Sequence, residues 1–233
     1  MTRPLLNLRT DYPILERITR PDGVRHYEEP HTKRLLASVT TILDGTADKT
    51  AILEWQERVG EKKADKARND GTALGTLIHQ HLEDYILGRP RPKGNNVIRQ
   101  MAEKMSDQII NRGLPNVDEV WGVESMLYYP GLYAGTTDLV GLYKGKPAIM
   151  DFKNAKKMRK RDMITDYFSQ GAAYGISHNH LFGTEIDTIV IFMVARDLSF
   201  ETFIVEGPEY VKYCEDFLMR VEAYQKKLSV SAA

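Results

Sequence analysis

The sequence is nearly free of cysteine, and it carries no net charge. Cys214 is the single cysteine among 233 residues, which excludes an intramolecular disulfide framework, a four-cysteine zinc site and an iron–sulfur cluster. Lys plus Arg and Asp plus Glu each number 32, so attraction to a nucleic acid must come from local patches and not from a global field. No apolar run approaches the length of a transmembrane helix, and the N-terminus lacks the long apolar region of a signal peptide. These absences predict a cytoplasmic protein that works without a membrane.

The pattern of apolar residues predicts one α/β domain with a mixed central β-sheet flanked by helices. A chain of 233 residues can bury a sizeable core. Within it we expect an N-terminal hairpin extension over residues 1–37, a helical region over 38–115 and a core over 116–228 that carries the chemistry. Helices are predicted at residues 38–43, 50–68, 71–87, 95–112, 167–182 and 209–228, and strands at 14–18, 24–27, 120–129, 132–143, 147–152, 188–195 and 200–205.

The most informative segment is a predicted hairpin that carries Asp138 on one strand and Asp151 and Lys153 on the next. A two-residue turn at Lys144-Gly145 pairs Tyr143 with Lys146, which places Asp138 directly across from Asp151. Directly opposed residues have Cβ atoms about 4.5–5.5 Å apart, and like charges there are destabilising. Side chains alternate along a strand, so Lys153 points to the same side as Asp151. A divalent metal with oxygen ligands would neutralise the two acids, and a metal beside a lysine suggests phosphodiester chemistry.

The register of this hairpin has alternatives. Lys-Gly is a weaker hairpin turn than Asn-Gly, and a slip of one residue would put the two acids on opposite faces. The segment would then be an edge strand with solvated charges. The neighbouring residues favour a buried pair, because charge inside an apolar run needs partners. These apolar neighbours are Leu139, Val140, Leu142, Ala148, Ile149, Met150 and Phe152.

A histidine and a glutamate outside the hairpin are candidates for the same site. Gly71, Gly75 and His79 recur every four residues and therefore share one side of a predicted helix. Each glycine costs about 1 kcal/mol in a helix interior, so we expect a metal site, a nucleic-acid backbone or a packed neighbouring element to approach that side closely. Glu124 lies on the strand before the hairpin, where it is either a ligand, a supporting group or a surface residue.

The region after the hairpin offers groups that could contact phosphate. Gln170 and Tyr174 are four residues apart on a predicted helix, where they could bind a phosphate, orient a water or simply belong to the core. A basic run precedes this helix, and it is either a solvated face or the place where a polyanion lies. We expect phosphate binding, because the run leaves directly from the hairpin. Its members are Lys156, Lys157, Arg159, Lys160 and Arg161.

Taken in order, these motifs resemble those of the PD-(D/E)xK nuclease superfamily, specifically its RecB-like exonuclease branch. The match covers roughly residues 38–228, and within the branch the sequence is most similar to mitochondrial genome-maintenance exonucleases and small stand-alone phage exonucleases. The motifs are Ser38-Val-Thr, Gly75-Thr-x-x-His79, Val123-Glu124-Ser, Gly135-x-x-Asp138, Asp151-Phe-Lys153 and Gln170-x-x-x-Tyr174.

The resemblance implies a restriction-endonuclease-like core and a metal site. His79, Asp138, Asp151 and the backbone carbonyl of Phe152 would bind Mg²⁺ or Mn²⁺. Lys153 would position or help to activate the attacking water and offset charge on the scissile phosphate. Acting as a base would require a lowered pKa of this lysine, whereas electrostatic stabilisation requires none, and the sequence leaves both open.

The resemblance also implies DNA contacts for Gln170 and Tyr174 and a supporting catalytic role for Glu124. Thr137 stands where the superfamily often has a proline before the first acid. The lack of cysteines separates the chain from relatives that carry an iron–sulfur cluster.

Three functions remain open at this stage. The first is a metal-dependent DNA exonuclease acting on single-stranded or frayed ends, in DNA recombination or repair. The second is a structure-specific or restriction-like endonuclease, and the third is a nucleic-acid-binding module without activity. A helical arch over the DNA, for which residues 50–112 are candidates, would favour the exonuclease. Without a helicase motif, the protein acts alone or with a single-strand-annealing, helicase or replication partner in trans; its small size favours a phage source and the host cytoplasm.

Overall fold

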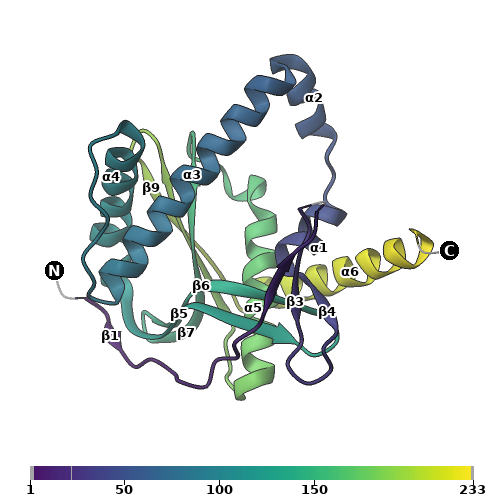
Figure 1. The fold of residues 1–233 in the computed structure, drawn as a ribbon. Coiled ribbons are helices and arrows are strands. Elements are labelled where there is room, and N and C mark those ends of the chain that lie inside the picture. Colours follow the sequence, from purple (N-terminus) through teal and green to yellow (C-terminus); the bar gives the residue numbers. More distant parts are fainter. Residues whose placement is uncertain (1–2, 22, 232–233) are drawn as a thin grey trace.

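The sheet of this protein is continuous and mixed, and helices cover both of its faces (Figure 1). The structure is a computed structural model that describes residues 3–21 and 23–231. The helices are α1 (Val39–Thr46), α2 (Thr50–Val59), α3 (Glu61–Ile86), α4 (Val97–Arg112), α5 (Thr165–Phe182) and α6 (Pro208–Ser231), with short 3₁₀ turns at Leu114–Asn116 and Arg161–Met163. The strands are β1 (Leu5–Leu6), β2 (Arg17–Thr19), β3 (Arg25–Glu28), β4 (Leu35–Ser38), β5 (Val117–Tyr129), β6 (Tyr133–Tyr143), β7 (Lys146–Ala155), β8 (Thr188–Ala195) and β9 (Phe200–Glu206).

Strand β6 is the centre of the sheet, and part of one of its edges is unpaired. One edge pairs with β5 along its length. The other edge pairs with β4 at Tyr133 and Ala134 and with β7 from Leu139 onward. Between these two ladders lie residues 135–138, which include Asp138. A gap in a ladder leaves room for side chains to approach the strand, and this gap is where the candidate site lies.

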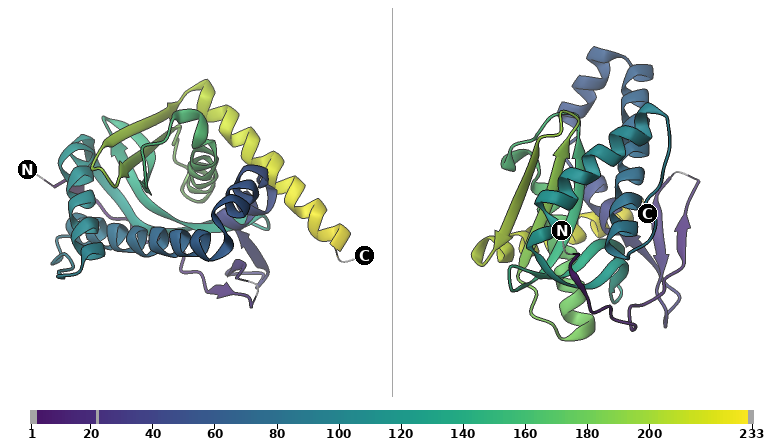
Figure 2. Two further views of the ribbon diagram at one scale, coloured as in Figure 1. Left: turned by 90° about the horizontal axis from the view of Figure 1, so that it is seen from above. Right: turned by 90° about the vertical axis from the view of Figure 1, so that its left-hand side faces the viewer.

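The two faces of the sheet bury separate apolar layers. Along β8, Val190, Phe192 and Val194 pack in the layer under α3 and α4. The alternate residues Ile189 and Ile191 pack on the opposite face against α5. This period of two is what a strand covered on both sides requires. The resulting layers of helix, sheet and helix confirm the predicted fold class (Figure 2).

The hairpin register predicted from the sequence is confirmed. Tyr143 pairs with Lys146 and Leu139 pairs with Met150. Lys144 and Gly145 both have positive φ, +49° and +77°, as a type I′ turn requires. The ladder between β6 and β7 stops at Leu139 and Met150, one position before the two acids. The strands therefore separate where the acids begin.

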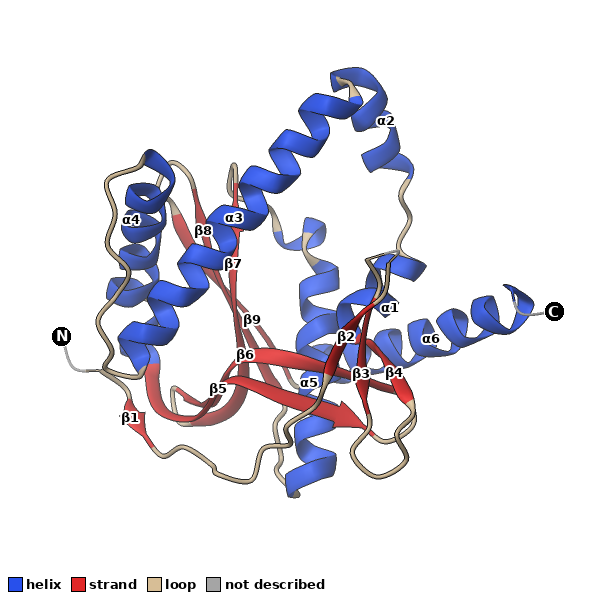
Figure 3. Ribbon diagram, in the orientation of Figure 1, coloured by secondary structure: helices blue, strands red, loops and turns tan. Residues whose placement is uncertain are grey.

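The helical region departs from the predicted boundaries. Two helices were expected at 50–68 and 71–87, but the chain breaks at Gly60, whose φ is +82°, and α3 then runs unbroken through Gly71. Figure 3 shows that α2 and the first half of α3 stand away from the sheet, joined to α1 by residues 47–49. We call this segment, residues 47–71, the arch. Within residues 3–21 and 23–231, no helix is both long enough and apolar enough to cross a membrane.

The N-terminal strands are part of the same sheet. The predicted N-terminal hairpin is present as β2 and β3; β2 is shorter than the strand expected at 14–18, whereas β3 has the expected length and is shifted by one residue. Two strands were missed: β1, which pairs with β5, and β4, which connects β3 to β6. Both are too short for an alternating pattern to be visible in the sequence.

Candidate metal centre

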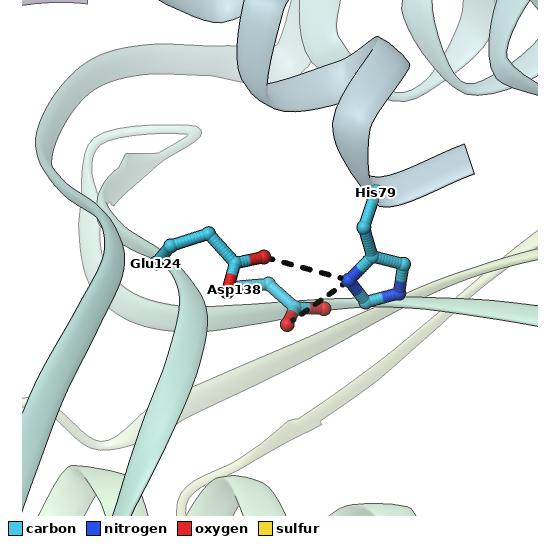
Figure 4. Close-up of side chains that lie close together, drawn as sticks. All are labelled: His79, Glu124 and Asp138. Atoms are coloured by element: carbon cyan, nitrogen blue, oxygen red, sulfur yellow. Dashed lines mark ion pairs between the residues drawn. The ribbon is translucent and has the colours of Figure 1, made fainter. Parts of the chain in front are cut away.

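Three side chains from three different elements converge beside the gap in β6 (Figure 4). His79 comes from α3, Glu124 from β5 and Asp138 from β6. The Nδ1 atom of His79 lies 3.6 Å from Glu124 Oε1 and 3.4 Å from Asp138 Oδ1. One nitrogen and two carboxylate oxygens thus lie within 4.8 Å of one another, a separation that one bound cation could span.

His79 is oriented by the backbone of β7. Its Nε2–H donates a hydrogen bond to the carbonyl oxygen of Phe152 at 3.0 Å, and its ring meets the Phe152 ring edge-on. This bond turns Nδ1 toward the two acids. The Phe152 carbonyl, predicted as a metal ligand, is therefore occupied by His79 in this structure.

Asp138 fills the gap in the ladder with its own side chain. Its Oδ2 accepts a hydrogen bond of 2.8 Å from the backbone N–H of Phe152, in place of the missing strand pairing. Burial by itself would raise the pKa of Asp138, but the charge and hydrogen bond of His79, with Lys153 and the Phe152 N–H, outweigh it and lower the pKa. Asp138 is thus held as a carboxylate, the form that binds a cation. The same contact with Asp138, supported by Glu124, overcomes burial and raises the pKa of His79.

Asp151 has a different environment from Asp138, although it is the next acid of the same hairpin. It is 2% exposed, and its Oδ2 lies 2.6 Å from the Lys153 ammonium, in an ion pair that lacks hydrogen-bond geometry. Burial raises the pKa of Asp151 to about 7, against the opposing effect of Lys153 and with the help of the nearby Asp138 charge. Asp151 was expected among the ligands, but it lies outside the three-residue group because its carboxylate is paired with Lys153.

Glu124 reaches the group through an unusual backbone conformation. Its φ is +48°, in the left-handed region that costs an L-residue roughly 1–2 kcal/mol. Its neighbours Val123 and Ser125 remain paired with β6, so the distortion is confined to this residue. Strain of this kind persists only where the surrounding structure imposes it, and it is common at functional sites. Glu124 was the weakest of the predicted site residues, yet it is a member of the observed group.

Gln170 and Tyr174 form a hydrogen-bonded chain that leads to Lys153. The Lys153 ammonium donates to Gln170 Oε1 at 3.1 Å, and Gln170 Nε2 donates to the Tyr174 hydroxyl at 3.3 Å. Tyr174 is only 3% exposed, and its ring packs against Gly135, where a Cβ atom would lie 2.8 Å away. The predicted direct contact of Tyr174 with DNA is therefore not supported, because the core covers its ring. Its contact with the site is through Gln170.

The glycines of α3 have two different explanations. A Cβ at Gly75 would lie 2.9 Å from the side-chain oxygen of Asn154, so a packed neighbouring element explains this glycine. Asn154 also donates a hydrogen bond to the carbonyl of Gly71, which ties α3 to β7 beside the site. At Gly71, by contrast, a Cβ would meet no atom within 4 Å.

The basic run after β7 is only partly available to a ligand. Arg161 donates to both carboxylate oxygens of Glu209 and to the carbonyl of Ile204, so its guanidinium joins α6 to the sheet. The role of Arg161 in DNA binding stays a prediction, although its guanidinium already has these partners. Lys156 and Arg159 line a hollow beneath the arch, while Lys157 and Lys160 are exposed.

The side chains at this site fit a divalent cation. The carboxylates of Glu124 and the buried Asp138 both face the one imidazole of His79, and carboxylates gathered in this way are costly unless a cation neutralises them. Carboxylate oxygens suit Mg²⁺ and Mn²⁺, and an imidazole nitrogen is accepted better by Mn²⁺. His79 and Asp138 of the predicted ligand set lie in this group, Glu124 joins them in place of Asp151, and their role as metal ligands stays a prediction.

Sequence reasoning missed the cations of the arch. Lys63, Lys66 and Arg68 of α3 and Arg196 of the β8–β9 turn face the same hollow as Lys156. The segment was interpreted as an exposed helix with many charges. The sequence signal for these cations was the spacing of Lys63 and Lys66, which are three residues apart and therefore lie on one side of the helix.

Comparison with known proteins supports the resemblance drawn from the motifs. No family model matches the chain. Mitochondrial genome maintenance exonuclease 1 of Xenopus tropicalis is 25% identical over 238 residues, which cover 94% of this chain and 64% of that protein. The Mus musculus protein of the same name is 26% identical over 210 residues, covering 85% of this chain and 61% of that protein. The chain is thus related to exonucleases, as predicted, and it spans about three fifths of the length of these relatives.

A solved structure shares the fold. The crystal structure of a candidate exonuclease from Eubacterium rectale aligns with a TM-score of 0.50 and 14% identity, covering 68% of this chain and 65% of that one. At this identity the likeness concerns the fold alone. It agrees with the central mixed sheet and the flanking helices described above.

Proposed function

We propose that this protein is a metal-dependent deoxyribonuclease that hydrolyses phosphodiester bonds from the ends of single-stranded or frayed DNA. The observation that carries the proposal is the convergence of His79, Glu124 and Asp138 beside the buried pair of Asp151 and Lys153. The relationship to exonucleases gives the reaction class.

Each residue has a role that follows from its position. His79, Glu124 and Asp138 would hold Mg²⁺ or Mn²⁺, with Asp151 and the Phe152 carbonyl adjacent to them. A bound divalent cation polarises a phosphoryl oxygen and lowers the pKa of a water. Lys153, held as an ammonium by its 2.6 Å contact with Asp151, would stabilise the negative charge that develops on the phosphate. This geometry favours the electrostatic role of Lys153 over a role as base.

Gln170 keeps the ammonium in place. Lys153 has three donors; one faces Asp151 and another donates to Gln170. The chain through Gln170 to the buried Tyr174 fixes the amide orientation, so that its oxygen, and not its nitrogen, faces the lysine. Preorganised charge of this kind contributes to catalysis because no reorientation is needed during the reaction.

The arch favours an exonuclease over an endonuclease. Helices α2 and α3, with the linker from α1, form a continuous stretch of chain beside the site (Figure 1). A strand lying beneath this stretch enters most simply by a free end. A protein that cuts within closed DNA would need an open face there.

The test is digestion of end-labelled linear and closed circular single-stranded DNA with Mg²⁺ or Mn²⁺. We expect the linear strand to be degraded and the circle to survive, and Lys153→Ala to degrade the linear strand at least about 100-fold more slowly. Equal cutting of the circle would exclude an exonuclease and favour an endonuclease. Full activity of Lys153→Ala would exclude the assigned chemistry, and binding without cleavage by the wild type would indicate a non-catalytic module.

A further inference from the structure

A hollow of about 580 Å³ lies between the arch and the end of β7. Its walls come from α2, from the first half of α3, from β7 after Lys153 and from the turn between β8 and β9. We call it the arch chamber. Its lining includes Trp55, Lys63, Lys66, Gly71, Lys156 and Arg196.

The arch chamber concentrates uncompensated positive charge. Six cationic side chains line it, but only one acid, Asp70. Among the residues that the structure describes, Arg68 pairs with Asp65 and Arg159 contacts the Tyr167 hydroxyl. The other four, Lys63, Lys66, Lys156 and Arg196, have no carboxylate within ion-pair distance. Like charges gathered in one hollow of a protein with zero net charge indicate a polyanionic ligand.

A second hollow on the other side of the metal centre shows that this charge is not a general property of the site. It measures about 440 Å³ and borders Glu124, and its two arginines, Arg9 and Arg89, are matched by Glu83 and Glu124 itself. Arg9 is also paired with Asp11 and Arg89 with Glu83. Of these two hollows, only the arch chamber has an excess of positive charge. It is therefore the better place for the part of a DNA strand that has not yet been cleaved.

The wall of the arch chamber also suits a nucleobase. Trp55 is half-buried in it, and the indole ring is a stacking surface that accepts any base. At Gly71, one turn before the tightly packed Gly75, a Cβ atom would meet no atom within 4 Å, so α3 presents bare backbone to the chamber at this position. Stacking on an exposed ring requires a base without a pairing partner, which selects single strands.

The arch chamber lies next to the metal centre along two elements, β7 and α3. Asn154 and Gly71 line it, and they are adjacent to Lys153 on β7 and two turns before His79 on α3. His79 comes eight positions after Gly71 on this helix, a rise of ~12 Å at 1.5 Å per residue. A stacked strand advances ~3.4 Å per nucleotide, so roughly three or four nucleotides cover that distance.

We infer that the arch chamber anchors an unpaired DNA strand three or four nucleotides from the scissile phosphate, with its phosphates at Lys63, Lys66 and Arg196 and one base against Trp55. The inference rests on the proposed nuclease function, and it adds that efficient cleavage requires a minimum length of unpaired strand. Duplex ends with overhangs shorter than about four nucleotides would not reach the anchor. They would be cut slowly at limiting substrate.

The binding test uses the two tryptophans of the chain as reporters. In Trp121→Phe, Trp55 is the remaining fluorophore; in Trp55→Phe, it is Trp121. Metal-free protein is titrated with a ten-residue oligothymidylate and with a blunt DNA hairpin. We expect the oligothymidylate to quench Trp55 and not Trp121, and the hairpin to quench neither. Equal quenching by the hairpin would overturn the selection of unpaired bases, and an unresponsive Trp55 would overturn the stacking contact.

A matched pair of charge reversals separates the arch chamber from general electrostatics. Lys63→Glu removes a lining cation, while Lys62→Glu makes the same change on the adjacent residue of α3, which does not line the chamber. We expect Lys63→Glu to weaken oligothymidylate binding at least about fivefold and to reduce the slope of log affinity against log salt by about 0.7, the value for one phosphate contact. Lys62→Glu should change affinity less than twofold. Equal effects of the two variants would overturn the proposal.

The experiments distinguish an error in the proposed DNA anchor from an error in the proposed nuclease function. If Lys153→Ala loses cleavage but Lys63→Glu binds and digests like wild type, the anchor is wrong and the function stands. If oligothymidylate binding depends on Lys63 but Lys153→Ala cleaves normally, the anchor stands and the chemistry is wrong. With overhangs of two to eight nucleotides, kcat/KM of the wild type should rise steeply near four, and a flat profile would contradict the spacing.

Discussion

Asp138 and Asp151 are the same residue type and lie one position beyond the last pair of one hairpin, yet they have opposite electrostatic environments. Asp138 accepts the Phe152 N–H and faces His79, which lowers its pKa. Asp151 is more deeply enclosed, faces Lys153 and has its pKa raised to about 7. The neighbour, and not the residue type, decides which acid is held as a carboxylate and which shares its charge with an ammonium. The site is therefore divided into a cation-binding half and a half that carries its own cation.

Replacing Asp138 should have the largest effect, because it removes the carboxylate at the centre of the cation-binding half. For Asp138→Asn we expect single-turnover cleavage of a labelled single strand to fall by about 10³-fold or more, equivalent to ~4 kcal/mol of transition-state stabilisation. Calorimetric titration should show that Mn²⁺ binding is lost as well. Retained Mn²⁺ affinity would show that Asp138 is not the central ligand.

Replacing Lys153 should divide catalysis from metal binding. Lys153→Ala removes the ammonium that stabilises charge on the phosphate, so cleavage should fall by roughly 10²–10³-fold. It also frees the Asp151 carboxylate, so Mn²⁺ should bind as tightly as in wild type or more tightly. The two measurements are single-turnover cleavage and calorimetry. If Lys153→Ala lost Mn²⁺ binding together with cleavage, the two halves of the site would not be distinct.

Replacing Glu124 tests both the metal affinity of the cation-binding half and the backbone strain at this residue. For Glu124→Ala we expect Mn²⁺ affinity to fall about 10-fold, within the range for groups that support a metal. Glu124→Gly should lose the same affinity, but its free energy of unfolding should be about 1 kcal/mol larger than that of Glu124→Ala, because glycine adopts the φ of +48° without strain. Urea denaturation compares the two variants. Equal stabilities would show that the left-handed conformation is not retained.

The smallest effects should come from the hydrogen-bonded chain behind Lys153. Gln170→Ala removes the acceptor of the lysine, and kcat should fall by about 10-fold with little change in KM. Tyr174→Phe keeps the ring packed on Gly135 and removes only the hydroxyl, so kcat should fall less than about threefold. Steady-state kinetics on a labelled strand gives both values. A mainly raised KM in Gln170→Ala would instead support the originally predicted DNA contact of Gln170.

Much of the sheet was predictable because its signals are local. The continuous apolar run over residues 188–195 predicted β8 with its observed bounds, and the turn at Lys144-Gly145 set the register of β6 and β7. The break at Gly60 was missed because glycine also occurs inside α3, at positions 71 and 75. Only packing distinguishes these cases, since Asn154 contacts Gly75 and φ is left-handed at Gly60.

The sequence predicted which residues lie together at the candidate site better than it predicted what each of them contacts. His79, Asp138, Asp151 and Lys153 were all expected and do lie together. That Arg161 pairs with Glu209, and that the Tyr174 ring is buried, depends on contacts with segments distant in the sequence. Such contacts leave no periodic pattern in the chain.

The sequence by itself determined the longer strands, the turn at Lys144-Gly145 and therefore the register of β6 against β7, because strand patterns and turn geometry act over a few neighbouring residues. Only the tertiary structure decided which acid would face a histidine 59 positions earlier in the chain and which a lysine two positions later. It also brought the cations of the arch to the end of β7. These pairings depend on how α3 packs over the sheet, and electrostatic environment is set by distance in space and not by distance along the chain.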